Sequence, residues 1–263
     1  QTHFGIWGPG LLGIRGSRAL AFSRTAPYTR AIVMDRESRI LSFTTGPDDW
    51  QKLLADPEKQ WRTGYSARTL AHCWEDAEGF PPEVEHPFLE SNDPLLEGLQ
   101  PVLAVPEFKV PLPGGGRASQ NDLFVLARSV AGPVTIMVEG KVSESFGPRI
   151  ADWLQDASAG KKTRLSFLIQ TLGLSERPSG GVRYQLLHRA ASAILTGEQY
   201  RAAAAVLLVH SFSRERAGWA DYQAFTRFFG VEAVEGTIQR LNPVSHPPLF
   251  GVWVVGDPRF LKS

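Results

Sequence analysis

The chain has 263 residues, of which 43% are hydrophobic and 21% charged, and its formal net charge is +1. These values are ordinary for a globular protein with a real core, built as one large domain or two small ones. The single cysteine, Cys73, excludes an internal disulfide and a zinc site made of several thiolates. No apolar run approaches the ~20 residues that span a bilayer. We therefore expect a cytoplasmic protein without a membrane segment.

Residues 1–34 differ from the remainder, because they contain four arginines and no acidic residue. Their Gly- and Arg-rich composition loosely resembles a transit peptide. A poorly ordered or non-native arm, with Met34 as the natural start, is the interpretation we prefer. Residues 35–263 then form a single domain with 24 basic and 27 acidic residues, a net charge of −3. An acidic body argues mildly against nucleic-acid binding unless a local basic groove exists.

The N-terminal part of this domain predicts one short strand and two helices. Residues 40–43 read as the strand and residues 47–55 as the first helix. The segment 65–78 predicts a stronger helix, since its apolar residues recur at three-and-four spacing. Ser66 is placed to cap it, and the glycine and prolines at 79–82 end it.

Three extended segments follow, joined by short connections. Residues 100–111 contain several prolines and predict an edge or irregular strand. Residues 122–128 and 134–142 predict two further strands, with a turn at 131–133 between them. Connections this short are typical of an antiparallel meander.

The rest of the chain alternates between helical and extended patterns. The expected helices are 149–157, 161–172, 182–195 and 220–229, and the expected strands are 203–209 and 250–255. The order of helix, three strands, helices, strand, helix and strand predicts an α/β fold with a mixed central β-sheet flanked by helices.

Three ionisable residues stand out within the predicted meander. Glu139 and Lys141 are two positions apart on one strand, so their side chains project from the same face. Asp122 opens the preceding strand, and a hairpin turning at 131–133 places it across from that pair. Gly140, between them, leaves the backbone accessible. Charges that interrupt a nearly continuous apolar strand are costly unless they are paired or bind a metal.

Two carboxylates and one ammonium group form the minimal equipment for metal-dependent phosphodiester hydrolysis. Mg²⁺ prefers hard oxygen ligands, often only one or two carboxylates plus waters and substrate phosphate. The cation neutralises charge on the phosphate, and a lysine can orient the attacking water.

With these residues the chain resembles the PD-(D/E)XK nuclease superfamily, as a divergent branch. Asp122 matches the first acid of its motif and Glu139-Gly140-Lys141 the second. Gln185, beside Tyr184 at the start of a later helix, matches a Gln or Tyr often found there, and Glu75 or Glu78 matches a glutamate that some members add from the first core helix. The resemblance covers roughly residues 65–212. Two features depart from it: Asn121 replaces the usual proline, and an extra helical segment spans 149–172.

This resemblance implies a restriction-endonuclease-like core of helix, three-strand meander, helices and strand. It further implies that Asp122 and Glu139, with Glu75 as an optional ligand, hold Mg²⁺ or Mn²⁺. Lys141 would position or activate the water, and Gln185 would help to orient Lys141 or the water. The implied partner is nucleic acid, DNA rather than RNA. The oligomeric state stays open, a homodimer included.

Other interpretations of the same residues remain. A second Glu-x-Lys triplet, Glu107 to Lys109, has Asp93 upstream, but prolines bracket the triplet. The charges of the first set could instead form a structural ion-pair network. A catalytically inactive nucleic-acid- or protein-binding module on the same fold is the alternative function. His188 and His210 show no metal-ligand spacing, so we expect them to be structural.

Overall fold

The computed structural model describes residues 44–115, 117–175 and 180–263. Contacts divide the chain into residues 1–33 and 34–263, and every described residue belongs to the second unit. The predicted N-terminal arm and the predicted strand 40–43 lie outside the described residues. No helix in the described part of the chain is both long and apolar enough to cross a membrane.

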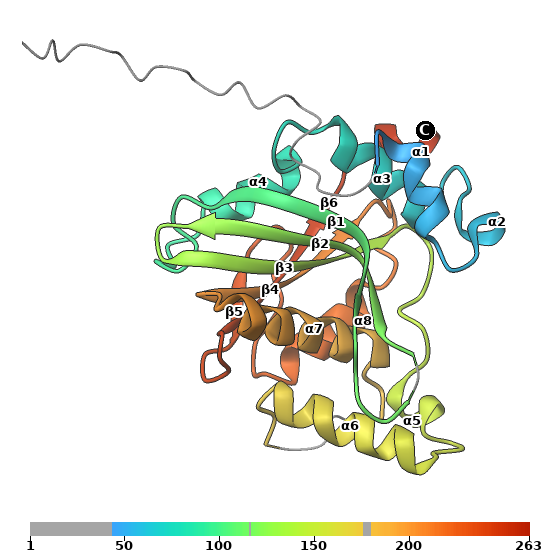
Figure 1. Cartoon of the computed structure of the whole chain (residues 1–263), viewed down its shortest axis with the longest axis vertical. Coiled ribbons are helices and arrows are strands. Elements are labelled where there is room, and N and C mark those ends of the chain that lie inside the picture. Colours follow the sequence, from blue (N-terminus) through green and yellow to red (C-terminus); the bar gives the residue numbers. More distant parts are fainter. Residues whose placement is uncertain (1–43, 116, 176–179) are drawn as a thin grey trace, which may run out of the picture. The chain divides into compact units, whose positions relative to one another are not determined.

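A six-stranded mixed sheet forms the centre of the unit (Figure 1), in the order β1-β2-β3-β4-β6-β5. The strands are β1 (Gln100–Val110), β2 (Ser119–Ser129), β3 (Gly132–Lys141), β4 (Ala204–Ser211), β5 (Gln239–Asn242) and β6 (Leu249–Val255). β1, β2 and β3 are antiparallel neighbours, as the short connections predict. β4 runs parallel to β3 and to β6, and β5 is antiparallel to β6.

The β2–β3 hairpin sets the register of the meander. Ser129 pairs with Gly132 across a tight turn, and the ladder extends to Leu123 opposite Val138. β1 is an edge strand, which explains why it continues through Pro101 and Pro106: a proline without an N–H is tolerated where one side of a strand is unpaired.

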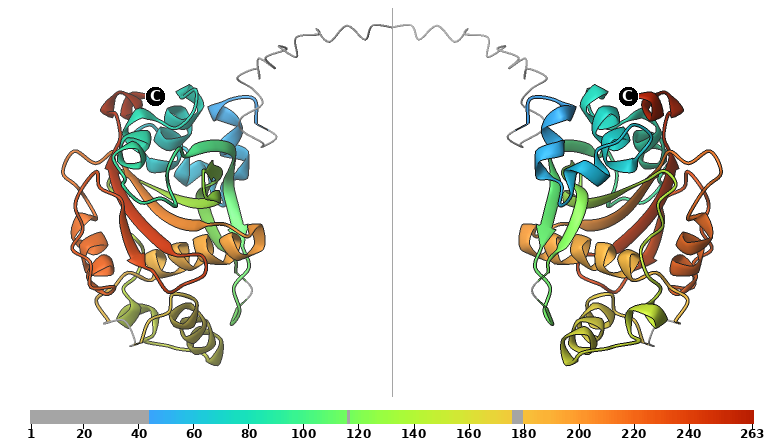
Figure 2. Two further views of the ribbon diagram at one scale, coloured as in Figure 1. Left: turned by 90° about the vertical axis from the view of Figure 1, so that its left-hand side faces the viewer. Right: turned by 90° about the vertical axis from the view of Figure 1, so that its right-hand side faces the viewer.

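The parallel part of the sheet is buried on both faces. All residues of β4 are buried, and its sequence is correspondingly almost entirely apolar. A sheet of this kind needs helices on each side, and Figure 2 shows them on both sides of the curved sheet.

One face of the sheet packs against α1 (Pro47–Trp50), α3 (Ser66–Asp76) and α4 (Pro82–Leu89). The opposite face packs against α7 (Tyr184–Tyr200) and α8 (Trp219–Arg227). α5 (Ile150–Trp153) and α6 (Ala159–Thr171) contribute side chains to the same core, and α6 packs against α7. The remaining short helices are η2 (Gln51–Leu53), α2 (Pro57–Gln60) and η3 (Pro258–Lys262). The fold is therefore α/β, a mixed central sheet flanked by helices, as the sequence pattern predicts.

Several local predictions need correction. The helix expected over 149–157 is only the single turn α5, whereas α7 runs five residues beyond the predicted end at 195. α4 and β5 were not predicted, because prolines begin and interrupt α4 and β5 has only four residues. Ser66 is the first residue of α3 rather than its side-chain cap. Its N–H instead donates to Glu144 Oε1 at 2.8 Å.

Candidate active site

Asp122 lies where β2 and β3 separate. Their ladder ends at Leu123 and Val138, while β2 continues alongside β1 as far as Ser119. Asp122 Oδ2 accepts the backbone N–H of Gly140 at 2.8 Å, in place of a carbonyl of the neighbouring strand. The predicted hairpin therefore does bring Asp122 to the end of β3.

Glu139 and Lys141 lie at the end of β3, and both are buried, with relative exposures of 1% and 4%. Lys141 Nζ contacts Glu139 Oε1 at 2.5 Å. Both side chains project toward α7, on the same face of the sheet as the buried Met137. The shared strand face expected from their spacing is present.

Helix α7 adds two side chains from one of its faces, because residues four apart are neighbours on a helix. Gln185 Nε2 donates to Glu139 Oε1 at 2.6 Å, so the predicted Gln185 joins the cluster. Arg189 Nε donates to Glu139 Oε2 at 2.5 Å, and Arg189 Nη2 lies 3.6 Å from Asp122 Oδ1. Arg189 was not predicted. Its position one turn after Gln185 was the available signal.

These residues line a cavity of about 400 Å³. Its wall also includes Lys59, Tyr65 and Ser66 from the segment that leads into α3, and Glu144, Gln120 and Glu107. The segment around α3 thus closes the side of the site that the sheet leaves open.

Glu107 is an acidic residue of this cavity that sequence reasoning did not assign to the site. It comes from the rival triplet on β1, yet it shares the cavity with Asp122, and Gln120 Nε2 donates to its Oε2 at 2.5 Å. Its backbone has φ 53°, a left-handed conformation that costs free energy in a glutamate. Asp93, the upstream partner in the rival set, instead pairs with Arg240 at 2.6 Å.

The carboxylates of the site differ in their protonation. Burial, together with the charge of Glu139, raises the pKa of Asp122 to about 7. Burial and the charge of Asp122 likewise raise the pKa of Glu107 to about 8. Burial opposes ionisation of Glu139 too, but the charges of Arg189 and Lys141 outweigh it and lower its pKa to about 2. Glu139 is thus a fixed anion, while Asp122 and Glu107 gain from any further positive charge.

The proposed optional ligand Glu75 does not join this site. Its Oε1 accepts the indole N–H of Trp50 at 2.8 Å, and it is absent from the lining of the cavity. On α3 the face that meets the sheet is taken by Leu70, Cys73 and Trp74, so Glu75 points toward α1 instead. The structure therefore does not bring Glu75 together with Asp122 and Glu139.

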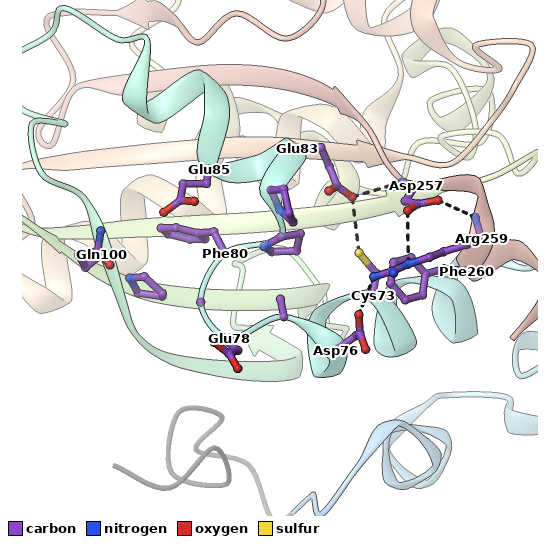
Figure 3. Close-up of a pocket in the computed structure, with 15 residues that line it drawn as sticks. Cys73, Asp76, Glu78, Phe80, Glu83, Glu85, Gln100, Asp257, Arg259 and Phe260 are labelled. Carbon is purple, nitrogen blue, oxygen red and sulfur yellow. Dashed lines mark hydrogen bonds and ion pairs between the residues drawn. The ribbon is translucent and has the colours of Figure 1, made fainter. Parts of the chain in front are cut away.

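A second polar cluster lies on the opposite face of the sheet, at a cavity of about 830 Å³ (Figure 3). Cys73, Glu83 and His210 each bring one potential ligand atom within 4.8 Å of the others. Cys73 Sγ is 3.6 Å and His210 Nε2 is 3.0 Å from Glu83 Oε1. This spacing alone is compatible with a cation.

The hydrogen bonds of His210 argue against a metal there. Trp74 Nε1–H, which can only donate, points to His210 Nδ1 at 3.2 Å, so Nδ1 carries no proton. The neutral imidazole then carries its proton on Nε2 and donates it to Glu83. Burial lowers the pKa of His210 and raises that of Cys73, which keeps the ring neutral and the thiol protonated. In this Glu83 cluster Trp74 donates to His210, and His210 and Cys73 both donate to the carboxylate of Glu83. These hydrogen bonds are mutually satisfied, so we expect the role of the cluster to be structural.

The comparison with protein families decides the classification of the chain. Residues 43–258 match the model of the Domain of unknown function (DUF6946). The chain belongs to the DUF6946 family. This DUF6946 match contains Asp122, Glu139, Lys141, Gln185 and Arg189, so the whole candidate site lies within the family's domain. No curated protein and no solved structure matches the chain.

Proposed function

We propose that this protein is a metal-dependent nuclease that hydrolyses phosphodiester bonds of nucleic acid, with DNA favoured over RNA. The order α3, β1–β3, α7 and a β4 parallel to β3 supports a restriction-endonuclease-like core. The observation that carries the proposal is the meeting of Asp122, Glu139 and Lys141 in one cavity at the end of β3.

The donor set fits Mg²⁺ or Mn²⁺. Asp122 and Glu139 offer the hard carboxylate oxygens that these ions prefer. Asp122 is also a carboxyl whose pKa is raised, and a neighbouring dication would stabilise its ionised form. When bound, such an ion supplies charge neutralisation at the phosphate and a water of lowered pKa.

The protein's own residues then have separate tasks. Lys141, buried and held against Glu139, is placed to orient the attacking water and to stabilise negative charge as it develops. Gln185 fixes the carboxylate of Glu139 from the helix side. In the overall reaction water attacks phosphorus, one P–O ester bond breaks, and the leaving oxygen takes up a proton.

One observation favours the alternative of a catalytically inactive nucleic-acid- or protein-binding module. Glu139 already accepts from Lys141, Gln185 and Arg189, so its two oxygens are engaged by the protein itself. In that alternative the cluster is an ion-pair network that stabilises the fold.

Cleavage assays separate these two functions. The full chain is incubated with single-stranded DNA, double-stranded DNA and RNA in Mg²⁺, Mn²⁺ or EDTA. We expect cleavage with either ion and none in EDTA. Lys141→Ala should reduce the rate by at least about 10²-fold, the usual scale for removing one group that stabilises the transition state.

The matched control is Lys262→Ala, which removes an exposed lysine of η3 that does not line the cavity. It should cleave at the wild-type rate. Cleavage by Lys141→Ala at that same rate would remove Lys141 from the mechanism. A wild-type protein inactive on all three substrates, with every ion, would favour the non-catalytic alternative.

A further inference from the structure

Arg189 is the cation that most directly contacts both proposed metal ligands. It reaches the site from α7, is 6% exposed, and contacts Glu139 through Nε and Asp122 through Nη2. Its third nitrogen, Nη1, lies 3.4 Å from the hydroxyl of Ser119, which in turn contacts His188 Nδ1 at 2.8 Å. The guanidinium therefore sits between the two carboxylates, held by a defined set of partners.

The formal charges around this guanidinium are nearly balanced. Glu107, Asp122 and Glu139 contribute three negative charges when ionised, and Lys141 and Arg189 contribute two positive ones. Two further charged groups line the cavity, but Glu144 is occupied by backbone N–H groups and Lys59 by Asp56. A divalent cation that binds beside Arg189 would be repelled at short range by the positive charge of the guanidinium, because a buried site screens charges poorly.

This inference rests on the proposed function and concerns how the site is regulated. We infer that Arg189 is a resident counter-ion that occupies the place of the metal in the free protein. It releases Asp122 and Glu139 when a divalent cation binds. The freed guanidinium remains at the wall of the cavity, where a substrate phosphate is the bidentate partner that suits it. Metal and nucleic acid then bind cooperatively, and the site binds the metal ion only weakly until nucleic acid is bound.

The first test measures Mn²⁺ and Ca²⁺ affinity without nucleic acid, by calorimetry, in the wild type and in Arg189→Met. Methionine keeps much of the side-chain length and removes the charge. We expect Arg189→Met to bind either ion on the order of tenfold more tightly, the effect that one neighbouring charge has on the occupancy of a titrating site. Arg189→Lys keeps the charge and should stay near the wild type.

Arg183→Met is the matched control. Arg183 directly precedes α7, pairs with Asp221 at 2.9 Å and is outside the cavity lining. Its loss should leave metal affinity unchanged. Thermal unfolding adds a second readout: Arg189→Met should melt below the wild type without metal and gain more from added Mn²⁺. A merely structural arginine would lower the melting temperature without enlarging the gain from metal.

The wild-type protein provides an independent test should Arg189→Met fail to fold. Nitrogen NMR of arginine side chains, with Arg189→Lys for assignment, reports the Nε–H that Glu139 accepts. Adding Mg²⁺ should speed its exchange with water.

The outcomes are distinct. Metal binding by the wild type with an unchanged Arg189 signal, or with no tighter binding in Arg189→Met, overturns the inference and leaves the nuclease proposal standing. Failure of both wild type and Arg189→Met to bind metal, together with no cleavage, overturns the proposed function.

Discussion

The two polar clusters lie on opposite faces of one sheet and bury carboxylates in different ways. Around Glu83 the donors are the Cys73 thiol, the neutral His210 ring and the backbone N–H of Asp257, and all three donate to the same carboxylate oxygen. Although burial acts against it, the hydrogen bond and charge interaction with His210 lower the pKa of Glu83 to about 2. Around Asp122 and Glu139 the neighbours are cations and further carboxylates, and the pKa of Asp122 is raised.

This difference separates a structural network from a candidate active site. The Glu83 cluster has one anion and enough donors to satisfy it, so it gains little from a ligand. The Asp122 cluster contains more acidic groups than its two cations neutralise, in a cavity that solvent can enter. Perturbed carboxylates in such a cavity are typical of functional sites.

Glu139→Gln should have the largest effect, because it leaves Lys141 and Arg189 buried beside a neutral amide. We expect a loss of about 4 kcal/mol in the free energy of unfolding, on the scale of breaking a buried ion pair. Urea titration measures this loss, and cleavage should fall with it by at least about 10²-fold. Glu215→Gln, at an exposed glutamate, is the control. An undiminished stability in Glu139→Gln would show that the ion pairs contribute nothing net.

His210→Ala should be nearly as destabilising but should spare metal binding. It removes the acceptor of Trp74 and a donor to Glu83, and it leaves a void in a fully buried position. A loss of about 3 kcal/mol in the free energy of unfolding is expected. The control is His86→Ala, at an exposed position of α4. Weaker Mn²⁺ binding in His210→Ala would contradict a purely structural role for the residues around Glu83.

The pH dependence of stability should also differ between the clusters. Asp122 and Glu107 bind protons more tightly in the folded state, so stability present at lower pH is lost as pH rises through about 7 and 8. Burial lowers the pKa of three histidines, so their contribution to stability increases as pH rises, but only below the unfolded pKa near 6.5. They are His72, His188 and His210. Between pH 7 and 8.5 the free energy of unfolding should fall by roughly 1 kcal/mol per pH unit.

Urea titrations across this pH range measure the slope. Asp122→Asn should reduce it, and saturating Mg²⁺ should suppress it in the wild type by keeping the carboxylates ionised. A slope identical in the wild type and Asp122→Asn would contradict the raised pKa of Asp122.

Cys73→Ala should have the smallest effect, about 1 kcal/mol in the free energy of unfolding, because a thiol is a weak donor to Glu83. Since burial raises the pKa of Cys73, the native thiol should react slowly with a thiol-specific reagent and rapidly after unfolding. Rapid labelling of the native protein would contradict a protonated, enclosed thiol.

Local pattern determined much of this protein. Strand alternation and a short turn place Asp122, Glu139 and Lys141 on one face, since both depend only on neighbouring residues. The same reasoning predicted the meander and the α/β class, whereas the participation of Gln185 was implied only by the resemblance to the PD-(D/E)XK superfamily. It missed α4 and β5, whose short or proline-containing sequences carry little periodic signal.

Only the tertiary structure decided how distant segments meet. It placed Arg189 between the two carboxylates, brought Glu107 from β1 into the same cavity, and directed Glu75 toward Trp50. It also joined Trp74 of α3, Glu83 of α4 and His210 of β4 on one face of the sheet. Periodicity specifies which face of an element is apolar, whereas the partner of each polar side chain depends on the packing of elements far apart in the chain. That packing determines which charges are neutralised by the protein and which remain for a ligand.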